Sequence, residues 1–311
     1  MQFERKESIK IPDKKIVRVK RMNHILEVLD LRTENNGFNS IKKLNAEQYL
    51  ILDTGEVQNY VKSENRGQNV AGLKDTFKKI SDLINNNFVG GGNEIHLVTT
   101  YAENMTDEKR LLKDNKYFWQ NWKRCFGEHF EYINIVEPQG RGAWHNHFLI
   151  KDIKNESLFI PWQKIKEIWT NGSIHIKTIK GVDNLGAYLN AYLSNVEIFD
   201  DGNGNFDVPD EVVKSMLHGE KYNFKDVEVD GVKKKFVKGA RCCMYPPGMN
   251  IYRKSKGILH PEVEKIPYYK AKEVVGSSQP NYSTTLEISD NGKLLNVITY
   301  ESYNLKRLSS I

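Results

Sequence analysis

The stretch from Glu131 to Ile150 constrains the fold of this chain more than any other. Two segments of alternating apolar residues, 131–137 (EYINIVE) and 144–150 (WHNHFLI), predict β-strands. The loop between them is short and contains Gly140 and Gly142, which permit a tight reversal. A short loop joins antiparallel neighbours only, because parallel strands need a long crossover. The chain is therefore expected to contain an antiparallel hairpin at this point.

Apolar spacing on both sides of this hairpin predicts alternating helices and strands. Between residues 70 and 196 the expected order is helix, strand, helix, strand, strand, helix, strand, helix. The bounds are 72–87, 94–101, 107–126, 131–137, 144–150, a helix that begins at Pro161, 173–179 and 184–194. In the helix after Pro161 we expect Trp162, Ile165, Ile168 and Trp169 to face inward. This order indicates an α+β fold, with a central antiparallel sheet flanked by helices and irregular N- and C-terminal extensions.

We expect three consecutive parts in the chain. They are an N-terminal extension of strands and loops (1–66), a core (67–200) and a loop-rich region with basic segments and hairpins (201–311). Tight turns are expected at Thr54-Gly55, Asp230-Gly231 and Asn291-Gly292, because glycine and asparagine tolerate positive φ.

Composition narrows the class of protein. Apolar residues make up 39% of the 311 residues, enough for a packed core. No window approaches the roughly 18 apolar residues of a membrane span, so we expect no membrane partner. Residues 1–21 are charged and lack an apolar centre, so no signal peptide is expected. Three cysteines without a C-x-x-C pattern argue against a disulfide framework or a thiolate zinc site and indicate a reducing cytoplasm.

The positive charges are clustered, although the net charge of +6 is mild. Residues 1–25 hold eight Lys or Arg against three acids, and Lys233-Lys234-Lys235 with Lys238 forms a second basic run. Such clusters fit contacts with the phosphates of a nucleic acid, so the N-terminal extension (residues 1–66) is a candidate for DNA contact. A solvated protein surface is an equally good interpretation.

Two histidines and one carboxylate are brought together by the predicted hairpin. Alternate side chains of a strand share a face, so His145 and His147 project from the same side. Across the hairpin Glu137 would pair with His145, with β-carbons about 4.5–5.5 Å apart. Such a cluster suits one divalent cation, with positions open for substrate oxygens. The alternative is a pair of half-buried histidines with hydrogen-bond partners, and His96 and His175 on other strands suit core or surface roles.

Tyr188 and Tyr192 stand four residues apart in the segment GAYLNAYLSN (186–195), so a helix places them on one face. Leucines flank them, and the alternative is therefore a packed stripe of aromatic and aliphatic side chains. A phenol, with a pKa near about 10, is a poor nucleophile at neutral pH. A cation that polarises a phosphodiester would compensate by stabilising charge in the transition state.

Taken together, these segments resemble the HUH endonucleases, the initiators of rolling-circle replication. WHNHFLI is similar to their His-hydrophobe-His motif, although Asn146 replaces the hydrophobe. HLVTTY (96–101) resembles their first motif, and AYLNAYLSN resembles their tyrosine helix. ARCCMYPPGMNIYRKSKGI (240–258) resembles a downstream segment of replication initiator (Rep) proteins of Gram-positive bacterial plasmids and phages, which are related to the filamentous-phage gene II group. The resemblance spans residues 70–260.

The resemblance implies a metal-dependent DNA endonuclease and strand transferase. Glu137, His145 and His147 would hold Mn²⁺ or Mg²⁺. Tyr188 or Tyr192 would attack the scissile phosphate, leaving a 5′-phosphotyrosine link and a free 3′-OH primer; Tyr192 is favoured because Tyr-Leu-Ser-Asn is more similar to the family's pattern. The implied partners are single-stranded or hairpin origin DNA, a host helicase and a DNA polymerase, in the cytoplasm of a bacterial host.

Six further residues are candidates for DNA contact, and each has an alternative role in packing or at a solvated surface. They are Arg141 in the hairpin loop, Thr99 and Thr100 in the first motif, and Arg241, Arg253 and Lys254 in the downstream segment. Two aromatic residues of the same segment, Tyr245 and Tyr252, are candidate base-stacking platforms.

Two other functions stay open from the sequence. A relaxase or transposase would use the same chemistry, whereas a non-catalytic DNA-binding regulator would bind DNA without metal and form no covalent adduct. The contiguous His145-Asn146-His147 argues against an HNH nuclease, whose residues are spread over a ββα unit. The sequence shows no G-x-x-x-x-G-K-[ST] motif of a fused helicase, and it does not indicate an oligomeric state.

Overall fold

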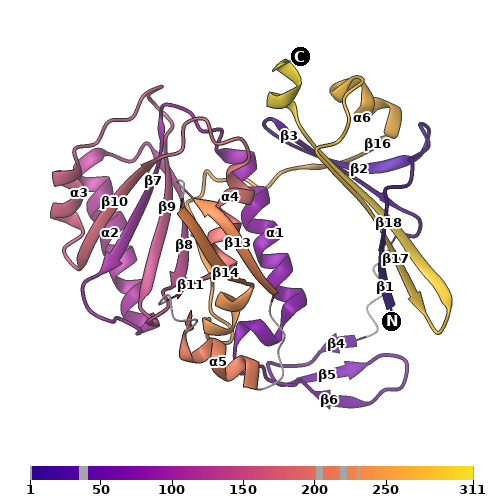
Figure 1. Ribbon diagram of the computed structural model, residues 1–311, viewed down its shortest axis with the longest axis horizontal. Helices are drawn as coiled ribbons and strands as arrows, with labels where there is room; N and C mark the ends of the chain where they lie inside the picture. Colours follow the sequence, from indigo (N-terminus) through magenta and orange to yellow (C-terminus); the bar gives the residue numbers. More distant parts are fainter. Residues whose placement is uncertain (1, 35–40, 201–205, 218–222, 230–231, 311) are drawn as a thin grey trace. The chain divides into compact units, whose positions relative to one another are not determined.

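The computed structural model describes residues 2–34, 41–200, 206–217, 223–229 and 232–310 (Figure 1). Contacts divide the chain into two compact units, Met1–Ser63 with Glu262–Ile311, and Glu64–Pro261. The first unit therefore combines both ends of the chain, whereas the sequence alone suggested three consecutive parts with boundaries after residues 66 and 200.

After the 3-10 helix η1 (Arg66–Gln68), the second unit contains eight elements in the predicted order. These are α1 (Val70–Asn87), β7 (Glu94–Tyr101), α2 (Glu108–Phe126), β8 (Phe130–Pro138), β9 (Trp144–Asp152), α3 (Trp162–Ile168), β10 (Gly172–Thr178) and α4 (Leu185–Ser194). Asp107 caps α2 by accepting hydrogen bonds from the backbone N–H groups of Lys109 and Arg110. The order predicted from apolar spacing is confirmed.

The strands of this unit form a five-stranded antiparallel sheet in the order β10-β7-β9-β8-β15, with β15 at Tyr252–Lys254. Figure 1 shows α2 and α3 on one side of the sheet and α1 and α4 on the other. The α2 side is aromatic, because the ring of Phe118 lies 5.0 Å from that of Phe148 and Trp119 packs on Tyr132. The predicted α+β class, an antiparallel sheet flanked by helices, is confirmed.

Strands β8 and β9 form the predicted hairpin. Its register pairs Glu137 with His145, as expected from the sequence. The loop closes with a 2.8 Å hydrogen bond from the backbone N–H of Gln139 to the carbonyl oxygen of Ala143. Gly142 adopts a φ of 87°, which L side chains rarely adopt, so a glycine is required at this position.

After α4 the chain forms a small antiparallel sheet in the order β12-β11-β14-β13. Its elements are β11 (Val196–Asp200), β12 (Phe206–Asp207), α5 (Asp210–Leu217), β13 (Asn223–Val229) and β14 (Val232–Lys238), followed by the 3-10 helix η2 (Ala240–Met244). The predicted turn Asp230-Gly231 lies outside the described residues. Tyr245, which follows η2, is fully buried and donates a 3.0 Å hydrogen bond to the carbonyl oxygen of Val136, so it cannot serve as a base-stacking platform.

The first unit is built on a six-stranded antiparallel sheet in the order β1-β17-β18-β3-β2-β16. Its elements are β1 (Gln2–Lys6), β2 (Ile16–Met22), β3 (Ile25–Leu31), β16 (Val263–Pro267), α6 (Tyr268–Val275), β17 (Tyr282–Asp290) and β18 (Lys293–Asn304). A three-stranded sheet of β4 (Ile41–Lys43), β5 (Gln48–Ile51) and β6 (Val57–Asn59) belongs to the same unit.

Buried polar groups and tight turns organise this first unit. Buried Glu301 accepts hydrogen bonds from the phenol groups of Tyr268 and Tyr303, which join α6 to the sheet. The predicted turn at Asn291-Gly292 is confirmed, because both residues have positive φ between β17 and β18. Gly55, with a φ of 73°, lies between β5 and β6 as expected.

Within the described part of the chain, no helix combines the length and the apolar composition that a membrane crossing needs.

Candidate functional site

The hairpin places Glu137, His145 and His147 on one face of the sheet. In the register, Glu137 lies opposite His145, and His147 follows two residues later on the same strand. Glu137 and His147 are buried, and His145 is half-buried. Oε2 of Glu137 lies 2.5 Å from Nε2 of His147, and the rings of the two histidines are 6.3 Å apart. The predicted cluster is therefore present as a set of neighbours.

Three imidazole nitrogens in this cluster are buried and have no hydrogen-bond partner among the described residues. They are Nε2 of His145, Nε2 of His147 and Nδ1 of His96. The close contact between Glu137 and His147 lacks hydrogen-bond geometry, so it does not satisfy Nε2 of His147. Buried polar groups are nearly always paired, and an unpaired group points to a missing ligand, water or ion.

His96 is a neighbour of this cluster that the sequence did not single out. Nε2 of His96 lies 3.1 Å from Nδ1 of His147, and the two rings stack at 5.3 Å. If Nδ1 of His147 carries the shared proton, its Nε2 has a free lone pair on the side of Glu137. The register between β7 and β9 places the side chain of His96 on the same face of the sheet as His145 and His147. The contact between His96 and His147 depends on this register, which the sequence of β7 alone does not reveal.

Burial and neighbouring charges set the protonation of the cluster. Burial lowers the pKa of His145 to about 4 and that of His96 to about 3, because an apolar environment disfavours the charged imidazolium. Burial alone would raise the pKa of Glu137, but the charge of Arg241 and the contact with His147 outweigh it, so this pKa is lowered. Near neutral pH, the site therefore presents the neutral imidazoles of His96 and His145 and an ionised carboxylate.

Arg241, from η2, closes the site on the side of the hairpin loop. Its Nη1 forms an ion pair with Oε1 of Glu137 and donates a 2.6 Å hydrogen bond to the carbonyl oxygen of Pro138. Its Nε donates a 3.0 Å hydrogen bond to the carbonyl oxygen of Asn195, the residue that caps the C-terminal end of α4. The side chain is only 12% exposed, so Arg241 lies within the site rather than on an open surface as the DNA-contact assignment supposed.

The C-terminal end of the tyrosine helix is linked to this cluster through Arg241. Leu185 and Leu189 of α4 are buried in the core, while Tyr188, one residue before Leu189, is 36% exposed. The backbone of Tyr192 lies in the last turn of α4, and its side chain lies outside what the structure describes. Through Arg241, Asn195 is connected to Glu137. The C-terminal end of the helix is thus tied to the carboxylate, as the sequence could not reveal.

A buried polar network lies on the opposite face of the same strand. Asn146 accepts hydrogen bonds from the amides of Asn115 (2.6 Å) and Asn134 (3.3 Å) and donates one to Oγ1 of Thr99 (3.2 Å). All four residues are buried. Asn146, the departure from a hydrophobic residue between the two histidines, is therefore the centre of a network that joins α2, β7, β8 and β9.

This network corrects the DNA-contact assignment of Thr99. Its side chain is fully buried, points to the face opposite the histidines and is bonded to Asn146, so it cannot reach a nucleic acid. Thr100, by contrast, pairs with His145 in the register and is half-buried on the histidine face. Its carbonyl oxygen accepts a hydrogen bond from Nε1 of Trp169, and DNA contact by Thr100 stays a prediction.

The three remaining DNA-contact candidates lie on the hairpin loop and on β15. Nη2 of Arg141 donates to the carbonyl oxygen of Tyr101 at 3.2 Å, although the residue itself is exposed in the loop. Arg253 is half-buried on β15, and Nζ of Lys254 donates to the carbonyl oxygen of Ile258 at 2.7 Å. Contact of these residues with DNA stays a prediction.

The donor chemistry of the cluster fits a divalent cation. Two imidazoles with unpaired Nε2 atoms and one carboxylate oxygen are ligands that Mn²⁺ accepts, and Mg²⁺ also accepts the carboxylate. Among the described residues, no three His, Cys, Asp or Glu side chains are arranged around one point as a bound ion requires. Binding of an ion by His145, His147 and Glu137 would therefore require these side chains to rearrange.

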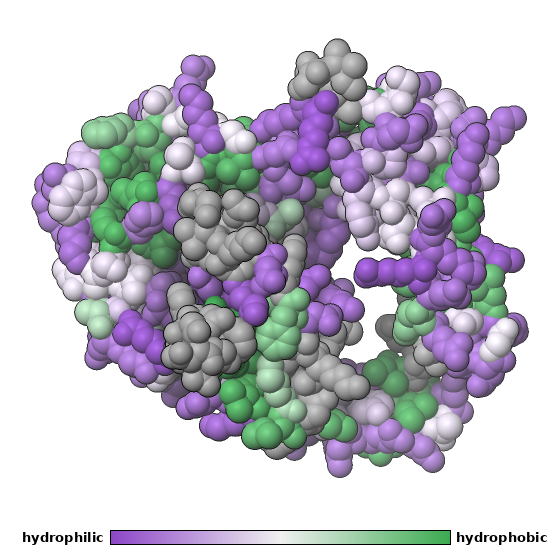
Figure 2. Space-filling model, viewed as in Figure 1, coloured by the Kyte–Doolittle hydropathy of each residue, from purple (hydrophilic) through white to green (hydrophobic). Residues whose placement is uncertain are grey.

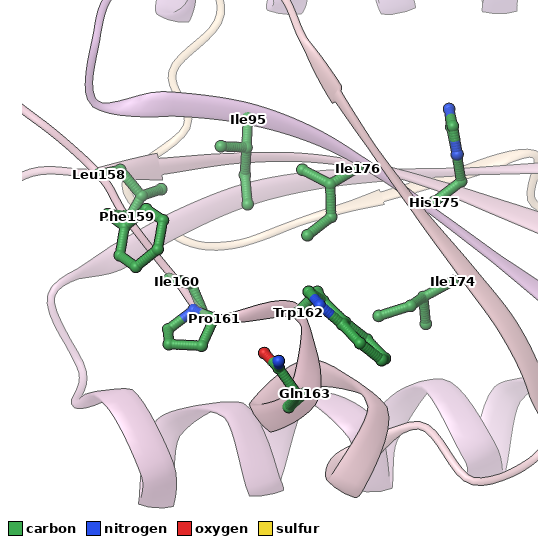
Figure 3. A pocket seen from close by; sticks show the side chains of 10 residues that line it. All are labelled: Ile95, Leu158, Phe159, Ile160, Pro161, Trp162, Gln163, Ile174, His175 and Ile176. Carbon is green, nitrogen blue, oxygen red and sulfur yellow. The ribbon is translucent and has the colours of Figure 1, made fainter.

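An apolar pocket lies elsewhere in this unit, between β10 and the segment that leads into α3. Its volume is about 660 Å³, and Figure 3 shows Phe159, Trp162, Ile174 and Ile176 among the side chains around it. Figure 2 shows apolar residues gathered on the surface where β10 and α3 lie in Figure 1. Trp162 is 59% exposed, so the prediction that it faces inward is wrong: it begins a short helix at the rim of the pocket.

Comparison with protein families finds a match within this unit. Residues 95–197 match a family model of replication-associated proteins, described as the ORF2 and gene II protein family. The matched segment runs from β7 into β11 and includes the Glu137, His145 and His147 cluster and both tyrosines of α4. It supports a replication initiator of the gene II protein type. Neither the curated proteins nor the solved structures contain a match to this chain.

Proposed function

We propose that this chain initiates replication by nicking and rejoining single-stranded origin DNA through a tyrosine nucleophile. One observation carries the proposal: Glu137, His145 and His147 share one buried face, with two unpaired imidazole nitrogens, inside the segment that matches the replication-associated family. Buried nitrogens without hydrogen-bond partners are costly for a purely structural core. They are useful where a cation and a phosphate bind.

Glu137, His145 and His147 would hold the cation, Mn²⁺ or Mg²⁺. When bound, such a cation polarises a phosphodiester and stabilises the charge that develops on its oxygens. His96 would keep His147 in the tautomer whose Nε2 is free, since Nδ1 of His147 is shared with Nε2 of His96. The carboxylate of Glu137 remains ionised because Arg241 lies against it.

Tyr192 or Tyr188 would act as the nucleophile. The phenol oxygen forms a bond to the scissile phosphorus as the bond to the 3′ oxygen of the preceding nucleotide breaks. The phenol proton passes to solvent, and the leaving 3′ oxygen is released as a hydroxyl that can prime synthesis. Because the phosphotyrosine bond retains the energy of the phosphodiester, the reverse attack by a 3′-OH rejoins DNA without a nucleotide cofactor. Two tyrosines would allow two successive transfers.

The DNA partner would be a single strand or a hairpin at the origin. Thr100 lies on the histidine face, and Arg141 extends the loop beside it, so both are proposed to contact the strand near the scissile phosphate. Arg253 and Lys254 of β15 would follow the backbone farther along. A host helicase and a DNA polymerase would supply strand opening and synthesis.

The direct test is a covalent adduct that survives denaturation. Wild-type protein is incubated with labelled origin single strand and Mn²⁺, and adducts are resolved under denaturing conditions. We expect an adduct that disappears with EDTA, with His147→Ala, and with Tyr188→Phe combined with Tyr192→Phe. Each single tyrosine variant identifies the nucleophile. Tyr117→Phe, at an exposed tyrosine of α2, is the matched control and should leave the adduct unchanged.

Two results would redirect the proposal. An undiminished adduct in the double tyrosine variant would refute the tyrosine mechanism. DNA binding that needs no metal and yields no adduct would favour the non-catalytic regulator. A relaxase or transposase would give the same adduct. The DNA sequence that is cleaved most rapidly would distinguish these enzymes from a replication initiator, which acts at a replication origin.

A further inference from the structure

Arg241 connects three segments of the second unit that are far apart in the sequence. Its guanidinium contacts the side chain of Glu137, the carbonyl oxygen of Pro138 at the hairpin and the carbonyl oxygen of Asn195 after α4. Two of its nitrogens serve three acceptors. A buried guanidinium is retained only when its donors are satisfied, and here they are satisfied by the carboxylate and by the end of the tyrosine helix.

The contact to Asn195 suits the C-terminal end of a helix. The last carbonyl groups of a helix have no partner within it and carry partial negative charge, so a cation is favourable there. The fixed positive charge of Arg241 therefore anchors the turn that contains Tyr192 and Ser194. The same guanidinium holds Oε1 of Glu137 and leaves Oε2 directed toward His147.

We infer that Arg241 is a positioning residue that orients Glu137 as a metal ligand and fixes the end of the tyrosine helix relative to it. The inference rests on the proposed function and deepens it, because it assigns the coupling between the cation site and the nucleophile to one side chain. Arg241 would touch neither the cation nor the DNA. It would act through Glu137 and through the backbone of Asn195.

Lysine cannot replace this side chain, although it keeps the charge. The guanidinium is a planar fork with donors in fixed directions, whereas a lysine ammonium is a single point on a shorter reach. Arg241→Lys keeps the positive charge near the metal ion, and with it the electrostatic repulsion of that ion. A change in metal affinity therefore reports the orientation of Glu137 and not a change of charge. Misplacement of a ligand or nucleophile by about 1 Å can cost about 100-fold in rate.

The test combines metal binding without DNA and adduct formation with DNA. Mn²⁺ affinity is measured by electron paramagnetic resonance for wild type, Arg241→Lys and Arg66→Lys. Arg66 is the matched control, because it is a half-buried arginine of the same unit whose Nη2 donates to Thr76. We expect Arg241→Lys to raise the Mn²⁺ dissociation constant by about 10-fold or more. At saturating Mn²⁺ we expect its adduct rate to fall by a further ~10- to 100-fold.

The outcomes separate this inference from the proposed function. If Arg241→Lys binds Mn²⁺ as wild type does, the inference is overturned whatever the adduct rate. If wild type binds no Mn²⁺, the cation site and the inference fail together. If only Arg241→Lys loses affinity but no protein forms an adduct, the inference stands and the tyrosine mechanism fails. Should Arg241→Lys not fold by near-ultraviolet circular dichroism, Arg241→Gln takes its place. Loss of the positive charge alone would favour a bound cation, so a raised Mn²⁺ dissociation constant in Arg241→Gln reports the lost orientation of Glu137, and an unchanged or lowered one overturns the inference.

Discussion

Replacing Asn146 by leucine, the kind of residue that the resemblance leads one to expect between the two histidines, should destabilise the protein. The side chain of Asn146 is fully buried and makes three hydrogen bonds, to Asn115, Asn134 and Thr99. Leucine has a similar size and a more apolar side chain. A family pattern alone would therefore predict a neutral or stabilising change.

The size of the expected loss in free energy of unfolding follows from the polar groups that lose their hydrogen-bond partner in Asn146→Leu. A buried donor or acceptor left unsatisfied costs about 1–3 kcal/mol. The amide of Asn115, at 2.6 Å, loses the shortest of the three bonds, while the hydroxyl of Thr99 can rotate and the 3.3 Å bond from Asn134 is weak. The expected loss in the free energy of unfolding is therefore about 3–5 kcal/mol rather than the largest possible sum. Pairing Asn146→Leu with Asn115→Leu should recover part of the loss, because both partners of the shortest bond are then apolar.

Urea unfolding of the single and double variants measures these free energies. Asn121→Leu is the matched control, because Asn121 accepts a long, exposed hydrogen bond from Arg124 on α2, and its effect should stay within about 0.5 kcal/mol. A single Asn146→Leu variant that unfolds at the wild-type urea concentration would refute the role of the network. Additive effects of Asn146→Leu and Asn115→Leu would show that the two amides are not coupled.

Three further predictions concern His96 and the contact between helices α1 and α4. His96→Leu should weaken Mn²⁺ binding by about 10- to 100-fold, whereas His96→Gln, whose side-chain oxygen can accept from Nδ1–H of His147, should retain most of the affinity. Titration with Mn²⁺ in the absence of DNA, followed by electron paramagnetic resonance, measures both affinities. Burial lowers the folded-state pKa of His96 to about 3, so His96 takes up a proton in the unfolded chain before it does so in the folded protein as the pH falls below about 6.5. The free energy of unfolding of the metal-free protein should therefore fall by about 2 kcal/mol by pH 5. His96→Gln should abolish this pH-dependent loss, and urea unfolding across this pH range measures it. Gly186→Ala should lower the thermal midpoint, because its β-carbon would lie 2.9 Å from the carbonyl oxygen of Ser81 where α4 meets α1, whereas Gly140→Ala meets only an ordinary contact; equal midpoints would contradict this.

The local pattern of the sequence was enough to predict the eight elements from α1 to α4. Apolar spacing with periods of two and 3.6 fixed their order, and the short loop between β8 and β9 fixed the register that pairs Glu137 with His145. Trp162 was misjudged because helical spacing assumes a helix that lies along the core. Helix α3 is short, begins after Pro161 and leaves its first residue at the rim of the apolar pocket.

The remainder of the candidate site depends on contacts between distant segments. Arg241 follows Glu137 by more than a hundred positions and reaches it only because η2 folds back against β8. His96 meets His147 only through the register of β7 and β9. Sequence spacing carries no information on either contact, because the chain between these segments is long and its path is set by packing of the whole unit.

Successive side chains of strand β9 point to opposite faces of the sheet, so a change on one face should affect the position of side chains on the other. His145 and His147 point to one face, and Asn146 between them points to the other, where it bonds to side chains of α2, β7 and β8. A strand fixed on both neighbours and on the helix behind it cannot shift by a fraction of an ångström without breaking that network. The network is therefore a means of holding the two imidazoles in place, and loss of Asn146 should weaken Mn²⁺ binding as well as folding. If Asn146→Leu loses stability but binds Mn²⁺ with unchanged affinity, the two faces are independent and the network serves the fold alone.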